Sequence, residues 1–111
     1  MLRKEDYICM TPFTYTEIFD NNQYLCCSNW LDKDNDINIT DSIKDNFYSE
    51  KAKGIRETIL DGSYSHCNER TCPFLTDLRN GKKGETLVKN TPQNREWARN
   101  QTRPKMVNFC F

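Results

Sequence analysis

The sequence predicts a small metal-stabilised α+β domain: a β-hairpin, one or two short helices, a cysteine-bearing loop and an extended C-terminal arm. Three observations predict this class. The chain has 111 residues, which is enough for one domain. Apolar residues make up only 36% of it, so its hydrophobic core should be thin for its length. Six cysteines offer another means of holding such a domain together.

The compartment follows from the N-terminus and from the hydropathy pattern. The first ten residues, MLRKEDYICM, carry charges where a signal peptide has its apolar region. No apolar run reaches the roughly 20 residues that a membrane helix needs. We therefore expect a cytoplasmic protein with no membrane partner. Six cysteines in a reducing compartment favour metal ligation or catalysis over structural disulfides.

A β-hairpin is predicted near the N-terminus. Residues 14 to 19 read TYTEIF and alternate β-forming side chains, residues 20 to 23 read DNNQ and supply turn chemistry, and residues 24 to 27 read YLCC. The returning strand therefore carries Cys26 and Cys27. Because successive strand residues face opposite sides, at most one of this pair easily points into a given site.

Two short helices are predicted after a polar loop at residues 31 to 38. Thr40 can cap the first helix, which runs to about Phe47. Ser49 can cap the second helix, which should end at Gly62. The apolar residues of the second helix recur at helical spacing and should face the core: Ala52, Ile55, Ile59 and Leu60.

The chain changes character after Leu78. We expect a first domain at residues 1 to 78 and an extended basic arm at residues 79 to 111, which ends in the strand-like run MVNFCF. Residues 79 to 105 hold eight Lys or Arg against two Glu, although the net charge of the whole chain is zero. A solvated basic segment explains this pattern better than a nucleic-acid arm, so nucleic acid is a partner that we favour less.

Four of the six cysteines are candidate metal ligands, because thiolates suit zinc, copper(I) and iron–sulfur clusters. Cys9, just before the hairpin, and Cys26 or Cys27 would form one half of the site. Cys67 and Cys72, in the loop after the second helix, would form the other. The spacing itself does not choose a metal, since the sequence lacks the two tight C-x2-C knuckles of a zinc ribbon.

The only histidine, His66, is expected to be a bystander. It adjoins Cys67 in sequence, and two neighbouring ligands would strain the backbone. A nucleophilic cysteine paired with this histidine would need an oxyanion donor or a base, and the sequence shows neither. We therefore predict no catalytic residue. Cys110 is expected to be a strand residue and not a ligand.

These cysteines and the sequence around them resemble the SPASM-type auxiliary iron–sulfur domain of radical SAM proteins. The resemblance covers about residues 9 to 76 and includes the hairpin end YLCCSNW, the helix SEKAKGIRETILDGSYSHC and the C-x4-C-P that follows. In the family the hairpin ligand lies a few residues after a turn glycine. Asn21 is the nearest counterpart here, which favours Cys26 and keeps Cys27 as the alternative. The resemblance implies a 4Fe-4S cluster held by Cys9, Cys26, Cys67 and Cys72.

The resemblance also implies a function and partners. We expect an auxiliary module for electron transfer or docking, with a radical SAM enzyme or a peptide substrate as its partner. Tyr24, Trp30 and Phe74 would shield the cluster from water. The sequence contains no C-x3-C-x2-C, so we expect it to lack the means to bind S-adenosylmethionine by itself. The alternative is a structural zinc module that docks on nucleic acid or protein through the basic arm.

Overall fold

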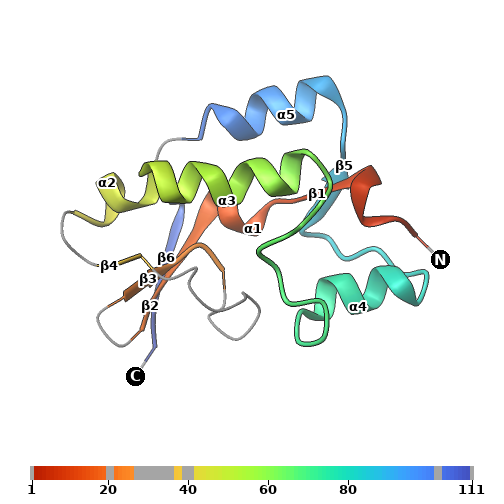
Figure 1. Cartoon of the computed structure of the whole chain (residues 1–111), viewed down its shortest axis with the longest axis horizontal. Helices are drawn as coiled ribbons and strands as arrows, with labels where there is room; N and C mark the ends of the chain where they lie inside the picture. Colours follow the sequence, from red (N-terminus) through yellow and green to blue (C-terminus); the bar gives the residue numbers. More distant parts are fainter. Residues whose placement is uncertain (1, 20–21, 27–36, 39–41, 102–103, 111) are drawn as a thin grey trace.

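The computed structural model describes residues 2–19, 22–26, 37–38, 42–101 and 104–110, and for residues 37–38 and 109–110 the backbone alone. Its architecture confirms the predicted α+β class, with a β-hairpin and several short helices (Figure 1). In chain order the elements are η1 (Lys4–Asp6), β1 (Tyr7–Cys9), α1 (Thr11–Thr14), β2 (Tyr15–Phe19), β3 (Asn22–Tyr24), β4 (Ile37–Asn38), α2 (Ile43–Phe47), α3 (Glu50–Leu60), α4 (Pro73–Arg79), β5 (Leu87–Lys89), α5 (Pro92–Arg99) and β6 (Met106–Cys110).

The larger sheet has the strand order β4-β3-β2-β6. β2 and β3 form the predicted antiparallel hairpin, in which Ile18 lies opposite Gln23. β6 confirms the predicted terminal strand and pairs in parallel with β2, with Tyr15 opposite Met106. One prediction is wrong: β3 ends at Tyr24, so Cys26 lies in a bend after the strand and not on it. This cysteine is buried, with 6% of its surface exposed.

The smaller sheet pairs β1 with β5, and its formation was not predicted. Cys9 lies within β1, opposite Leu87. The sequence had instead suggested a position for Cys9 outside any strand. The amide of Met10 continues the pairing and donates to the carbonyl of Thr86 at 2.9 Å. Strands of three residues that lie about 80 positions apart carry no local pattern, so this pair could not be predicted from the sequence.

The two predicted helices after the hairpin are present. Ser49 caps α3 as expected, because its side chain accepts a hydrogen bond from the amide of Ala52. The predicted core face of α3 is buried, together with Arg56, which was not predicted to be buried. Ser42 caps α2 by accepting from the amide of Asp45, whereas the predicted cap, Thr40, lies outside the described residues.

The prediction of an extended arm after Leu78 is wrong for its described residues, because they form the strand β5 and the helix α5. Thr91 caps α5 by accepting a hydrogen bond from the amide of Asn94, and Pro92 occupies the first helical position. Ala98 is the buried residue of this helix, so no apolar periodicity marks it in the sequence. In Figure 1, α5 runs alongside α3. The salt bridge between Arg99 and Glu57, at 3.1 Å, joins the two helices.

The buried apolar residues form two clusters, and α3 contributes to both. The first brings together β1, β5, α4 and the C-terminal end of α3. The second consists of Leu25, Phe47, Ala52 and Ile55. Within the described residues, no helix combines the length and the apolar character that crossing a membrane requires. Because α3 contributes residues to both apolar clusters, this helix connects the two parts of the core.

Gly62, directly after α3, offers a test of this arrangement. Its φ is +87°, and a Cβ placed there would lie 2.6 Å from Cβ and 2.9 Å from Cα of Glu5. We expect Gly62→Ala to lower the free energy of unfolding by about 2 kcal/mol or more, because both the conformation and the contact disfavour a side chain. Chemical denaturation measures this change.

Gly54→Ala is the matched control for that substitution. Gly54 lies inside α3, and an added Cβ would meet no atom within 4 Å. The same change should stabilise the protein by about 1 kcal/mol, because alanine is the better helix former. Equal effects of the two substitutions would contradict the proposed close approach of Gly62 to Glu5.

Candidate metal centre

Four cysteines predicted from the sequence line one cavity. Cys9 comes from β1, Cys26 from the bend after β3, Cys67 from the loop after α3, and Cys72 from the start of α4. The cavity is small, about 20 Å³, and the rest of its lining is mostly apolar. The structure thus brings together thiols that lie up to 63 positions apart in the sequence. Cys27, the predicted alternative to Cys26, lies outside the described residues.

Within the described part of the chain, none of the four cysteines forms a disulfide, so no disulfide explains their convergence. Cys9, Cys26 and Cys72 are buried, with at most 8% of their surface exposed. Cys67 is half-buried and is the most accessible of the four. Solvent therefore reaches the cavity most easily from the side of the loop that carries Cys67.

The environment of Cys9 favours a neutral thiol. Burial raises its pKa to about 11, and the proximity of the Cys72 thiol adds to this effect. Hydrogen bonds from the backbone and the side chain of Thr11 to the sulfur act in the opposite direction and lower the pKa. These donors come from the first residue of α1, two positions after the cysteine. They are already placed to stabilise a thiolate when a cation compensates the burial.

Tyr64 ties the cysteine loop to β1. Its hydroxyl donates to the carbonyl of Tyr7 at 2.6 Å and accepts from the amide of Cys9 at 3.1 Å. Burial raises the pKa of this hydroxyl, and the nearby thiols of Cys9, Cys67 and Cys72 raise it further, whereas the hydrogen bond from the amide of Cys9 lowers it. The backbone of Tyr64 has a φ of +52°, which is uncommon for a residue other than glycine. This conformation leaves the ring 2% exposed and lining the cavity.

Backbone hydrogen bonds hold the loop between Cys67 and Cys72 in shape. The amide of Cys67 donates to the carbonyl of Tyr64 at 3.0 Å, and the amide of Cys72 donates to the carbonyl of Asn68 at 3.0 Å. Pro73 then starts α4 with Cys72 as its N-cap residue. The C-x4-C-P stretch is therefore a turn that places both thiols on the same cavity.

The donor set fits a group that takes four thiolates. Within the described residues, however, no group of three or more His, Cys, Asp or Glu side chains could hold a metal ion in its present positions. A metal group in this cavity therefore requires the thiols to adjust. Among the described residues, no charged side chain lines the cavity, so the four cysteines are its main metal-binding groups there.

The aromatic residues predicted to shield the cluster, and the histidine beside Cys67, differ in their position relative to the cavity. Phe74 lines the cavity, as expected of a residue that excludes water. Tyr24 and His66 are not among the residues that line it. Trp30 lies outside the described residues. Thr11 and Tyr64 were not predicted as site residues, because their roles depend on contacts that no local pattern reveals.

Comparisons with models of protein families, with curated proteins and with solved structures found no match to this chain.

Tyr64→Phe tests the link between the loop and β1. The substitution removes the hydroxyl and leaves a buried carbonyl and a buried amide without this partner. We expect the free energy of unfolding to fall by about 1–3 kcal/mol. Tyr48→Phe, at a tyrosine with 40% of its surface exposed, should change it by less than about 0.5 kcal/mol. Thermal unfolding of both variants decides, and equal stabilities would refute the role assigned to Tyr64.

Proposed function

We propose that this chain binds a 4Fe-4S cluster and acts as an auxiliary module of a radical SAM system, in electron transfer or in docking a substrate or partner. The proposed ligands are Cys9, Cys26, Cys67 and Cys72. One observation carries the proposal: these four cysteines, from three separate stretches of the chain, line a single cavity. Four thiolates are the usual ligand set of such a cluster.

The surroundings of the thiols support this proposal. Hydrophobic side chains of Pro12, Ile59, Leu75 and Leu87 complete the cavity. An apolar wall limits the access of water, and hydrogen bonds to sulfur tune the reduction potential of a cluster. Thr11 supplies hydrogen bonds of this kind to the sulfur of Cys9. A cluster, when bound, would supply one-electron chemistry, while the chain holds the ligands, excludes water and orients the donors.

The exposure of the thiols supports one direction of approach for a redox partner. Cys67 is the most accessible of the four cysteines, and it lies in a loop whose shape depends on Tyr64. A redox partner would therefore approach from the side of this loop. The same side is open to a peptide that docks near the cluster, which keeps both roles within one proposal.

Anaerobic reconstitution with iron and sulfide tests the ligand set. We expect about four irons and four acid-labile sulfides per chain, with absorption near about 400 nm that dithionite bleaches. Serine in place of any of the four cysteines should remove most of the bound iron. Cys110→Ser, in β6, is the matched control and should retain it. Cys27→Ser tests the alternative ligand.

Two outcomes would contradict the proposal. A colourless protein without iron after reconstitution rules out the cluster. A protein that holds one zinc ion, and no sulfide even under anaerobic conditions, supports the alternative of a structural zinc module. If the cluster forms but no radical SAM enzyme exchanges electrons or binds, the metal assignment stands and the role in that system falls.

Thr11→Val tests the hydrogen bond to the Cys9 sulfur. It removes the side-chain donor and keeps the backbone donor and the shape of the residue. We expect the midpoint potential of the reconstituted protein to fall, because fewer hydrogen bonds to sulfur disfavour the more negative, reduced state. Thr58→Val is the control, since its hydroxyl donates to the carbonyl of Ile55 within α3. A potentiometric titration compares them, and equal potentials would contradict the role of Thr11.

A further inference from the structure

Arg56 is a buried cation with incomplete hydrogen bonding. Only 5% of its surface is exposed, because it lies on the buried face of α3 among apolar residues. Its Nε donates to the carbonyl of Pro12 at 2.7 Å, and its guanidinium carbon lies 4.0 Å from the centre of the Phe47 ring. Its Nη2 is buried and has no hydrogen-bond partner among the described residues. A buried charged group with a free donor is unusual in a folded protein.

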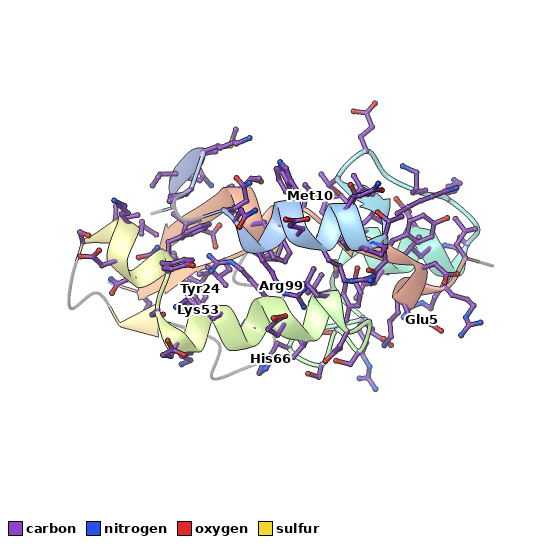
Figure 2. All side chains as sticks on the ribbon, turned by 90° about the horizontal axis from the view of Figure 1, so that it is seen from above. Glu5, Met10, Tyr24, Lys53, His66 and Arg99 are labelled. Carbon is purple, nitrogen blue, oxygen red and sulfur yellow. The ribbon has the colours of Figure 1, made fainter. Side chains whose placement is uncertain are left out.

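Arg56 is one of the residues that line a pocket between α3 and α5. The pocket has a volume of about 240 Å³, and Phe13, Leu60 and Ala98 form the apolar part of its lining. Lys53 and Arg99 also line it, and both are partly exposed to solvent. Figure 2, which looks down on the two helices, shows Arg99 in the space between them and Lys53 near the start of α3. The pocket is separate from the thiol cavity, whose lining does not include Arg56.

The charges that line the pocket are mostly positive. Lys53, Arg56 and Arg99 are cationic, and Glu57 is the one acidic residue among the lining side chains that the structure describes. Glu57 makes two hydrogen bonds to Arg99, at 3.1 and 3.3 Å, so its carboxylate is already engaged. The lining therefore keeps an excess of two positive charges, and the buried one has no acidic partner in the pocket.

Burial lowers the pKa of Arg56 to about 10, since the charged form loses hydration. The guanidinium remains charged at neutral pH. An isolated buried charge is costly. A bound oxyanion would offset that cost by accepting hydrogen bonds from the N–H groups of Nη2. Guanidinium pairs well with carboxylate and phosphate groups because its planar donors match two of their oxygens.

We propose that this pocket binds a small organic anion, in which a carboxylate or phosphate head pairs with Arg56 and an apolar body contacts Phe13, Leu60 and Ala98. Lys53 and Arg99 would attract the anion to the opening. The proposal does not rest on the 4Fe-4S cluster, because none of these residues is a proposed cluster ligand. The simpler explanation, in which Arg56 only anchors Pro12 and stacks on Phe47, predicts no anion binding.

Calorimetric titration of the full chain at low salt tests the proposal with two probes, benzoate and phenyl phosphate. We expect saturable one-to-one binding of at least one probe below about 10 mM. The probe that binds more tightly identifies the preferred head group. Arg56→Lys keeps the charge but loses the planar fork, and should weaken binding by about tenfold or more. Arg79→Lys, at an exposed arginine on α4, is the matched control and should leave binding unchanged.

Gln101→Glu provides a second variant that leaves Arg56 in place. Gln101 lines the pocket, and its substitution puts a carboxylate where it competes with the probe and repels it. We expect binding to weaken by about tenfold. Failure of both probes to bind, or binding that neither Arg56→Lys nor Gln101→Glu weakens, overturns the proposal. If Arg56→Lys does not fold, the result of Gln101→Glu decides alone.

Discussion

The hydroxyl of Tyr64 is the contact on which the arrangement of the thiols depends. It accepts from the amide of Cys9 and donates to the carbonyl of Tyr7, and so it joins the loop after α3 to β1. The backbone carbonyl of Tyr64 accepts from the amide of Cys67, so the same residue also holds a second cysteine in place. The left-handed backbone of Tyr64 costs on the order of 1 kcal/mol or more, and the ring's burial offsets this cost.

The short helix α1 links the thiol cavity to the pocket at Arg56. Thr11 donates hydrogen bonds to the sulfur of Cys9, and Pro12 lines the thiol cavity. The carbonyl of Pro12 accepts from Nε of Arg56, while Phe13 is part of the lining of the second pocket. One turn of helix therefore forms a wall of both cavities. The α3 helix positions this wall through a hydrogen bond from a buried charged group, a stronger interaction than one between neutral groups.

Features with a local signal could be predicted from the sequence. The α3 helix followed from its cap at Ser49, its apolar spacing and the glycine that ends it, and the hairpin followed from alternation around a turn. The β1–β5 pair and α5 could not be predicted. Three-residue strands have no period to detect, and a helix that buries one alanine has no apolar stripe.

The candidate site shows the same division between local and distant information. The four cysteines were predicted from their spacing and from the resemblance, and they line one cavity, although metal binding stays a prediction. The roles of Tyr64 and Arg56 depend on partners 57 and 44 positions away, so no pattern around either residue reveals them. Hydrogen bonds of this kind are set by the tertiary fold and become visible only when it is known.

The thiol cavity and the pocket at Arg56 both place polar groups where they lose contact with water. The fold gathers four thiols around one cavity and buries one guanidinium with a free donor, and apolar packing alone does not require either arrangement. A ligand that binds only the folded state stabilises that state by mass action. A cation at the thiols and an anion at Arg56 would each turn a buried polar group from a cost into a stabilising contact. Both would act on α1, whose residues lie against the two cavities, so their stabilising effects would strengthen the same part of the fold.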